Sequence, residues 1–187
     1  VKKSVKIIKR HNIDLALMHT TNLYPTPYNL VRLGAMQELM NEFPKIPIGL
    51  SDHTISNHAC LSAIAQGASL VERHFTDTMN RKGPDICCSM DEQQCQKLVE
   101  GSKIVFQMLG GNKEPLEEEK VTIAFAFATV VTIKKIKKGD KFTNKNIWVK
   151  RPGTGEIKAE DFQNIIGLKA AKNIELDTHV NWDDILK

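Results

Sequence analysis

The sequence contains little that would indicate a secreted, membrane or nucleic-acid-binding protein. Its 187 residues include four cysteines, with no CxxC pair and no spacing typical of a zinc site or a disulfide framework. No run approaches the roughly 18 apolar residues of a membrane span, and the chain begins with no signal peptide. The net charge of +4 is not gathered into a basic block. We therefore expect reduced thiols, a cytoplasmic location, and no binding to membranes or nucleic acid.

Alternating strand and helix patterns are present in the first part of the chain. Strands are predicted at Ile13–Met18, Pro47–Leu50 and Ser69–Phe75, each followed by a helix. This alternation is typical of parallel βα units. Three units alone leave unpaired sheet edges, and a (β/α)₈ barrel needs about 250 residues. We therefore expect residues 1–112 to be the last part of a TIM barrel. Its first part would be absent from this chain, which begins at Val1 without an initiator Met.

Capping residues predict the helix boundaries. Helices are expected to start at Thr26, with Pro27 in the first turn, at Ser56 and at Asp91. Gly67 is expected to end the second helix, and Gly110-Gly111 the third.

The pattern changes after residue 112. Residues 113–124 are polar and charged and are interpreted as a linker. The segment "FAFATVVTI" favours a strand, and turn glycines indicate a compact β-rich module over residues 125–187. Apolar residues recur in this module with the same spacing in two places, which two similar half-folds would produce. Chance is the alternative explanation of three such matches. The residues are Ile136, Phe142 and Ile147, then Ile174, Val180 and Ile185.

Two of the predicted strands run into a histidine, His53 in "GLSDHT" and His74 in "ERHFTD". The carboxyl ends of parallel strands share one edge of a sheet, and consecutive units are usually neighbours, so the two imidazoles are expected to lie close together. Strand alternation places Ser51 on the side of His53 and Glu72 on the side of His74. Two neutral imidazoles suit a Mn²⁺, Mg²⁺, Fe or Zn ion. The alternatives are hydrogen-bonded structural histidines, or an Asp52–His53 base without metal.

Polar side chains in the loops beyond the strands are candidate ligand contacts. Asn22 follows the first predicted strand, and Tyr24 lies just beyond it. The Gly83-Pro84 turn presents Asp85 on the His74 side, where it binds a sugar hydroxyl or caps the turn. Arg151, in "WVKRPGTGE", is by spacing alone an exposed charge.

Six sequence blocks resemble the C-terminal part of bacterial N-acetylneuraminate (sialic acid) synthases. In order, they are "TNLYPTPY", "GLSDHT", "ERHFTD", "GPDICCSM", "FAFATVV" and "VKRPG". Related legionaminate and pseudaminate synthases share several of them. The resemblance implies a TIM barrel followed by a small antifreeze-like (SAF) domain. It implies a transferase that condenses phosphoenolpyruvate with N-acetylmannosamine to give N-acetylneuraminate and phosphate. It also implies a divalent metal, Mn²⁺ with Mg²⁺ or Co²⁺ as alternatives, and a homodimer whose SAF domains reach into the partner's barrel.

The resemblance further implies roles for single residues. The metal ligands, which would be catalytic, fall on His53 and His74. The substrate contacts fall on Asn22, Tyr24, Ser51 near the phosphate, Asp85 at the sugar, Arg151 at the N-acetyl group, and Phe125, with Phe127 as the alternative aromatic. A glutamate and lysines of the family's early strands are missing from this chain. Thr20 stands where the family usually has Cys.

Other functions remain open. The acceptor is alternatively the precursor of legionaminate or pseudaminate. The 187 residues alone are expected to be inactive, so a module that only binds or dimerises is a second alternative. An aldolase-like or isomerase barrel without phosphoenolpyruvate chemistry is disfavoured by the "VKRPG" block.

Overall fold

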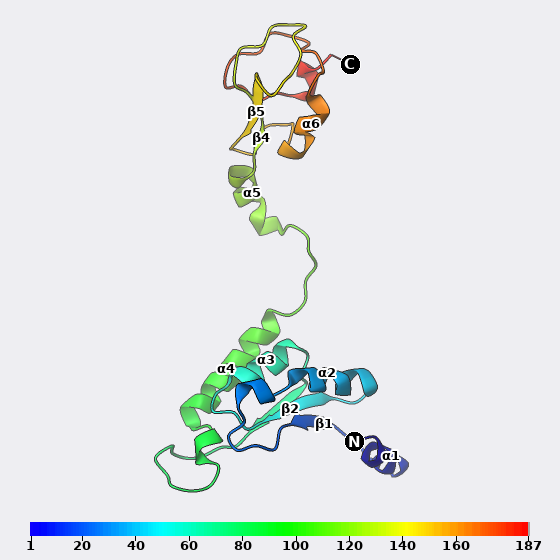
Figure 1. Cartoon of the computed structure of the whole chain (residues 1–187), viewed down its shortest axis with the longest axis vertical. Coiled ribbons are helices and arrows are strands. Elements are labelled where there is room, and N and C mark those ends of the chain that lie inside the picture. The colour runs from blue at the N-terminus through cyan, green and yellow to red at the C-terminus, as the bar shows by residue number, and fades with distance from the viewer. Residues whose placement is uncertain (187) are drawn as a thin grey trace. The chain divides into compact units, whose positions relative to one another are not determined.

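A computed structural model describes residues 1–186 as two compact units, Val1–Gly111 and a second unit that begins at Asn112 (Figure 1). Each unit has its own buried apolar core. Within the described residues, no helix is both long enough and apolar enough to cross a membrane.

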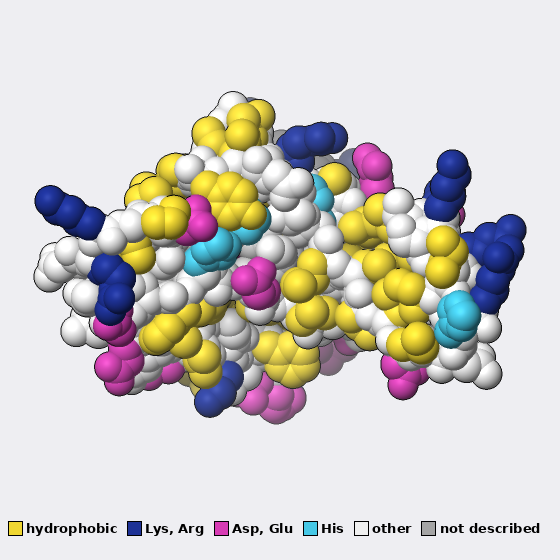
Figure 2. All heavy atoms as spheres, turned by 90° about the horizontal axis from the view of Figure 1, so that it is seen from below, with side chains coloured by type: hydrophobic (Ala, Val, Ile, Leu, Met, Phe, Trp, Pro, Cys, Tyr) yellow, Lys and Arg dark blue, Asp and Glu magenta, His cyan; other side chains and the backbone are white. Residues whose placement is uncertain are grey.

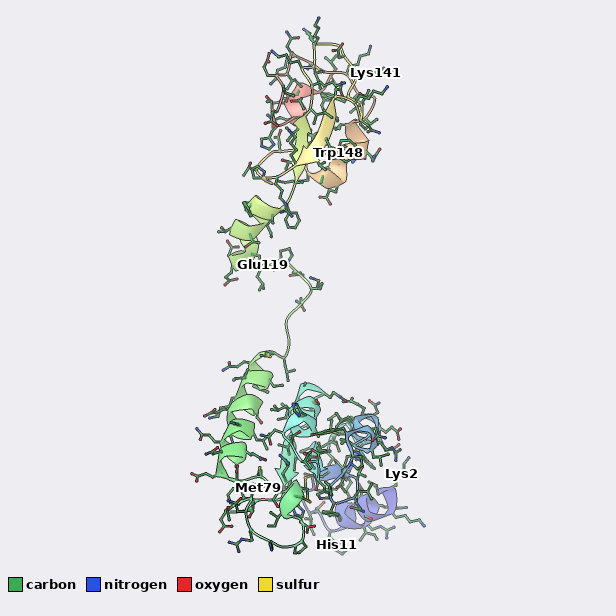
Figure 3. All side chains as sticks on the ribbon, turned by 60° about the vertical axis from the view of Figure 1, so that its left-hand side comes forward. Lys2, His11, Met79, Glu119, Lys141 and Trp148 are labelled. Carbon is green, nitrogen blue, oxygen red and sulfur yellow. The ribbon has the colours of Figure 1, made fainter. Side chains whose placement is uncertain are left out.

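The first unit alternates strands and helices around a parallel sheet. In chain order its elements are α1 (Lys2–Arg10), β1 (Leu17–Thr20), α2 (Leu33–Glu42), β2 (Ile48–Asp52), α3 (His58–Ala65), β3 (Leu70–Arg73) and α4 (Glu92–Gln107). The strands lie in the order β1-β2-β3, and both pairings are parallel. In Figure 3, Lys2 and His11 mark α1, and Met79 marks the long loop between β3 and α4. The predicted parallel βα units are confirmed.

Apolar side chains of α2, β2 and α3 form the core of this unit. Met36, Leu50 and Ala63 are almost fully buried there, and Leu33, Met40 and Phe43 of α2 pack against them. Burial of such a stripe is what stabilises a helix against a sheet, at roughly 25 cal/mol per Å² of apolar surface. α2 and α3 thereby pack against the strands of the sheet.

Two boundaries of the first βα unit differ from the prediction. The strand begins at Leu17, which pairs with Ile48, whereas Ile13 is 60% exposed, so only the part of the apolar run that meets a partner becomes strand. Thr26 does not cap a helix. Its hydroxyl donates to a backbone carbonyl at Leu23, and α2 begins only at Leu33.

The later helix boundaries lie close to those predicted. α3 starts at His58, and the Ser56 hydroxyl accepts the His58 N–H at 3.3 Å, although the cap position itself belongs to Asn57. The Asp91 carboxylate accepts the Gln94 N–H at 2.9 Å, which confirms Asp91 as the cap of α4. Beyond that helix, the chain turns through Gly110 and Gly111 with positive φ angles, which glycine adopts without steric cost.

The second unit is small and contains mostly turns and short strands. Its elements are α5 (Lys120–Ala126), β4 (Thr129–Thr132), β5 (Ile147–Lys150) and α6 (Phe162–Ile165), with a 3₁₀ turn at Glu117–Glu119. β4 pairs antiparallel with β5. Trp148, labelled in Figure 3, contacts the ring of Phe162 edge-on, with 5.4 Å between ring centroids.

The predicted strand from Phe125 is wrong in its first residues. Phe125 lies on α5, and the Phe127 N–H still donates to the carbonyl of Ile123. The strand starts only at Thr129, where pairing with Lys150 becomes available. The stretch interpreted as a linker therefore contains the 3₁₀ turn and most of α5.

The predicted internal repeat is confirmed. Ile136 and Ile174 exchange both backbone hydrogen bonds, at 2.9 and 2.8 Å. The other repeat residues lie in or against the same core, namely Phe142, Ile147, Val180 and Ile185. The two half-folds thus pack around one shared centre.

Candidate functional site

The two histidines beyond β2 and β3 lie next to each other. The ring centroids of His53 and His74 are 5.2 Å apart, and the ring planes are nearly perpendicular. Their strands pair in parallel up to the preceding residues, where Asp52 lies opposite Arg73. The predicted proximity of the two rings is confirmed. On the face seen in Figure 2, histidine side chains lie beside acidic and hydrophobic ones.

His53 is held in one orientation from several directions. It is 5% exposed, and its Nδ1 lies 3.0 Å from the carbonyl oxygen of Thr21. A carbonyl can only accept, so Nδ1 carries the proton and Nε2 keeps its lone pair. Tyr24 stacks on the ring, and the Thr26 N–H donates to the His53 carbonyl at 2.9 Å.

The alternative in which Asp52 orients His53 is wrong. The Asp52 carboxylate accepts the Thr54 N–H at 2.9 Å and the Thr54 hydroxyl at 3.0 Å. It also faces Arg73, on the side of the strand opposite to His53. Successive side chains of a strand point to opposite faces, so Asp52 and His53 cannot serve one another.

Ser51 and Glu72 occupy the same side of the sheet as the histidines. They are register partners on β2 and β3, and the Ser51 hydroxyl donates to the Glu72 carboxylate at 2.6 Å. This pair places a hydroxyl and a carboxylate two residues before the two histidines, on the same side of the sheet. Glu72 was noted in the sequence only through its alternation with His74.

Asp85 lies on the His74 side of the site, as the turn predicted. Its Oδ2 is 3.9 Å from Nδ1 of His74. The residue has a left-handed backbone (φ 62°) and precedes the 3₁₀ turn Ile86–Cys88. The Ser89 hydroxyl donates to the Asp85 carbonyl at 2.8 Å, which holds the loop in place. Asn22 is exposed in the segment after β1, near Tyr24 in the chain.

A buried ion pair beneath the histidines escaped the analysis of the sequence. Nε of Arg73 lies 3.3 Å from Oδ2 of Asp52, without hydrogen-bond alignment, and both side chains are almost fully buried. The sequence did contain a sign of this ion pair, because Asp52 and Arg73, which have opposite charges, directly precede His53 and His74. Burial, then the negative charge of Asp52, raises the pKa of the nearby Cys60 thiol, which therefore stays protonated and faces Asp52 at 3.7 Å.

The donor set at the strand ends fits a divalent cation in part. Within residues 1–186, no group of three or more His, Cys, Asp and Glu side chains is arranged to hold a metal ion alone. The His53–His74 pair offers two imidazoles, one of them fixed in the tautomer that leaves Nε2 free. Two imidazole donors leave coordination positions for substrate oxygens and water.

The hollows of the first unit lie mostly away from this pair. One of about 490 Å³ is lined by residues of the segment before α2 and of α3, among them Tyr28, Arg32 and His58, and by neither histidine of the pair. The space beside Ser51 and His53 holds only about 10 Å³. The strand ends are thus an open surface, which a sheet of three strands cannot enclose.

The second unit carries both Arg151 and Phe125. Arg151 follows β5 and is exposed, and Phe125 on α5 is 71% exposed. The Gly153 N–H donates to the carbonyl of Ala124 at 2.7 Å, so the loop of Arg151 lies against the helix of Phe125. Phe127, the alternative aromatic, packs against Gly153.

The loop after Arg151 is fixed by side chains that the sequence did not single out. The Thr129 hydroxyl donates to the carbonyl of Pro152 at 3.1 Å and lies 3.0 Å from Nδ1 of His179. The Lys158 ammonium donates to the carbonyls of Gly153 and Gly155. An exposed arginine on a fixed backbone is suited to binding a polar ligand.

Comparison with known proteins gives matches for both units. The NeuB family model matches residues 1–114, and the SAF domain model matches residues 127–186. An uncharacterized protein of Methanocaldococcus jannaschii is 37% identical over 98% of this chain and 55% of its own length. The N,N'-diacetyllegionaminic acid synthase of Campylobacter jejuni is 38% identical over 90% of this chain and 50% of its own length.

Among solved structures, the N-acetylneuraminic acid (sialic acid) synthetase of Leptospira borgpetersenii, in complex with citrate, is similar. It aligns with a TM-score of 0.59 and 31% identity over 65% of this chain and 43% of its own. The chain spans about half the length of the curated relatives it matches.

Proposed function

Because the chain belongs to the NeuB family, we propose that the complete protein condenses phosphoenolpyruvate with open-chain N-acetylmannosamine, forming N-acetylneuraminate and phosphate. The observation that carries the proposal is the His53–His74 pair, with ring centroids 5.2 Å apart and Nε2 of His53 left free. Together with the SAF domain match, it supports a sialic acid-type synthase.

In this reaction C3 of phosphoenolpyruvate attacks the aldehyde carbon of the sugar. Water adds at C2, and phosphate leaves by cleavage of its C–O bond, so one water is consumed for each phosphate released. A divalent cation held by His53 and His74, Mn²⁺ by preference, would supply Lewis-acid polarisation of the aldehyde oxygen.

The remaining residues of the first unit have binding roles in this proposal. Asp85 is suited to accept a hydrogen bond from a sugar hydroxyl, because its carboxylate is half-exposed on the His74 side. Tyr24, which stacks on His53, and Asn22 are assigned to substrate contacts from the segment after β1, and Ser51 is assigned to the phosphate side. Holding two substrates in register supplies much of the acceleration in such reactions.

Arg151 and Phe125 are assigned to the N-acetyl group of the sugar, in the barrel of a partner subunit. Their support is the fixed backbone after Arg151 and its contact with the helix of Phe125. The proposal therefore includes a homodimer in which each SAF domain completes the site of the other subunit.

A second acceptor is favoured by one observation. The C. jejuni N,N'-diacetyllegionaminic acid synthase is 38% identical to this chain. The same chemistry with the sugar precursor of legionaminate is therefore the alternative substrate assignment.

The test is phosphate release by the complete protein, including any residues that its gene encodes ahead of Val1. The metal-stripped protein is assayed with phosphoenolpyruvate, a panel of N-acylated amino sugars and added Mn²⁺, and the product is identified by mass spectrometry. We expect sugar-dependent release that requires Mn²⁺ and falls at least about 100-fold in His53→Ala and His74→Ala, with His11→Ala as the matched control. Release without sugar, or near-normal turnover in either histidine variant, would refute the proposal.

A further inference from the structure

The residues directly before the two histidines form a buried ion pair on the opposite face of the sheet. Asp52 and Arg73 end β2 and β3 and are register partners. Their side chains are 1% and 0% exposed. Because neighbouring side chains of a strand alternate, the ion pair and the two imidazoles share one stretch of backbone but face opposite ways.

Arg73 also joins the segments that carry the site. Its Nη2 donates to the carbonyl of Thr54, the residue after His53, at 2.8 Å. Its Nη1 donates to the Asn57 side chain at the start of α3, at 2.6 Å. A longer contact of 3.4 Å reaches the carbonyl of Cys88, in the 3₁₀ turn that follows Asp85. One guanidinium therefore contacts the chain beyond His53 and the loop of Asp85.

Asp52 completes the arrangement from the side of β2. Its carboxylate accepts the N–H and the hydroxyl of Thr54, and the protonated Cys60 thiol faces it. Thr54 is fully buried and is hydrogen-bonded to both members of the ion pair: its N–H and hydroxyl bind Asp52, and its carbonyl accepts from Arg73. The backbone on each side of His53 is fixed by groups that never touch its ring.

A buried ion pair is a poor way to gain stability. Removing two charges from water is costly, and apolar residues of similar volume often stabilise a core as well or better. Unlike an apolar side chain, an arginine donates several hydrogen bonds in one fixed plane. Here those bonds join the end of β3 to the segment after β2 and to the start of α3.

We propose that Asp52 and Arg73 are positioning residues that set the separation and aim of His53 and His74 for a shared divalent cation. The inference rests on the metal assignment of the proposed function. It adds two residues that would fix the geometry: Arg73, which ends β3 directly before His74, binds the carbonyl of Thr54, the residue directly after His53, and Asp52 pairs with Arg73.

The test is Mn²⁺ binding to the complete, metal-stripped protein, measured by titration calorimetry or by electron paramagnetic resonance of free Mn²⁺. The variants are Arg73→Lys, Asp52→Asn and the milder Asn57→Ala, which keeps both charges and removes one bond to Arg73. The control is Asp77→Asn with Arg81→Lys, because Asp77 and Arg81 form an exposed ion pair in the neighbouring loop. Thermal unfolding by circular dichroism is recorded for each protein, and binding is measured where all are folded.

We expect Arg73→Lys and Asp52→Asn to weaken Mn²⁺ binding about 10–100-fold, as loss of the groups that orient metal ligands usually does. Asn57→Ala should weaken it by a smaller factor, and the control should bind as the parent does. A role in stability alone would lower the unfolding temperature and leave the affinity of the folded protein unchanged, which would overturn the inference. If neither charged variant folds, the affinity of Asn57→Ala decides.

A failure of the proposed function gives a different result. If His53→Ala binds Mn²⁺ as the parent does, the metal assignment is refuted, and this inference with it. If His53→Ala loses Mn²⁺ while the Asp52, Arg73 and Asn57 variants all behave like the control, only the positioning role is refuted.

Discussion

Tyr24 stacks on His53 with 4.0 Å between ring centroids and an angle of 28° between the planes. The same tyrosine meets His74 edge-on at 5.5 Å. It is 48% exposed, so part of the side chain remains open to solvent. A single aromatic side chain thus contacts both candidate metal ligands.

Replacing Tyr24 separates its packing role from its polar role. Tyr24→Phe keeps the stack, so we expect Mn²⁺ affinity within about twofold of the parent, whereas Tyr24→Ala should lower it about 3–10-fold, since such aromatic pairs contribute about 0.5–1.5 kcal/mol. If the hydroxyl binds substrate, Tyr24→Phe raises KM alone. Calorimetry with Mn²⁺ and steady-state kinetics on the complete protein measure the two effects. Equal Mn²⁺ affinity in all three proteins would contradict the packing role.

The arrangement of the first unit was predictable because it depends on patterns that are local in the sequence. Apolar runs, helix-capping residues such as Asp91 and glycines that end a helix each determine the structure of only a few neighbouring residues. Parallel order then follows from the alternation of strands and helices, and it brings His53 and His74 to one edge.

The errors lie where a distant partner decides the local structure. Ile13 has the apolar character of a strand residue but no strand beside it, and the register with Ile48 starts at Leu17. Thr26 has the side chain of a helix cap, but its hydroxyl binds carbonyls of the preceding turn, and its N–H binds His53. These local conformations depend on tertiary contacts, which the intrinsic structural propensities of the residues do not describe.

The internal repeat was visible only as apolar spacing, yet polar groups repeat as well. The Thr143 N–H binds the Asn146 side chain at 2.7 Å, and at the equivalent positions the Asn181 N–H binds the Asp184 side chain at 2.8 Å. Because Asn and Asp share the acceptor oxygen that the turn needs, different residues build the same turn. Residue identity alone does not reveal this equivalence.

Thiol reactivity tests the burial and electrostatics of the site. Burial raises the pKa of Cys88, and burial with the Asp52 charge raises that of Cys60, so both thiols hold less thiolate at a given pH. Cys87 is exposed. We expect iodoacetamide at pH 8 to alkylate Cys87 first, Cys88 slowly, and Cys60 only in denaturant, as measured by mass mapping of peptides.

The pH dependence of this labelling has a definite sign. Raising the pH to 9 should leave Cys60 protected, because burial raises its pKa and its thiol remains protonated in the folded state. Cys87→Ser, as the matched control, should remove the fast phase and leave the rest unchanged. Alkylation of Cys60 in the native protein at the rate of Cys87 would show that the Asp52 environment is open to solvent.

Arg151→Ala tests the assignment of the second unit. We expect KM for the amino sugar to rise about tenfold or more, since a hydrogen bond from a charged group contributes about 1.5–3 kcal/mol, with KM for phosphoenolpyruvate unchanged. Lys145→Ala, another exposed cation of this unit, is the control. Steady-state kinetics with each substrate varied in turn measure the difference, and an unchanged sugar KM would count against the assignment.

Mixing two impaired variants, assayed at a sugar concentration well below the KM of Arg151→Ala, tests whether the arginine acts in the partner subunit. In a heterodimer of Arg151→Ala and His53→Ala, one composite site has both residues intact if the SAF domains are exchanged. Random assortment should then restore about a quarter of the parent activity. No recovery after verified subunit exchange would place Arg151 in the site of its own chain.

Gly155 tests whether the fixed loop is what aims Arg151. A Cβ at this position would lie 2.5 Å from Nδ1 of His179 and 2.7 Å from Oγ1 of Thr129. The Thr129 hydroxyl donates to the Pro152 carbonyl, and Nδ1 of His179 contacts that hydroxyl. Gly155→Ala must push them apart, so we expect it to lower the free energy of unfolding by about 1–3 kcal/mol and to raise the sugar KM of the folded enzyme. Gly34→Ala is the control, because no atom lies within 4 Å of the added Cβ there. Denaturant titration and kinetics measure both effects. A destabilised variant with an unchanged sugar KM would contradict this expectation. Thr129 and His179 would then stabilise the fold without orienting Arg151 for sugar binding.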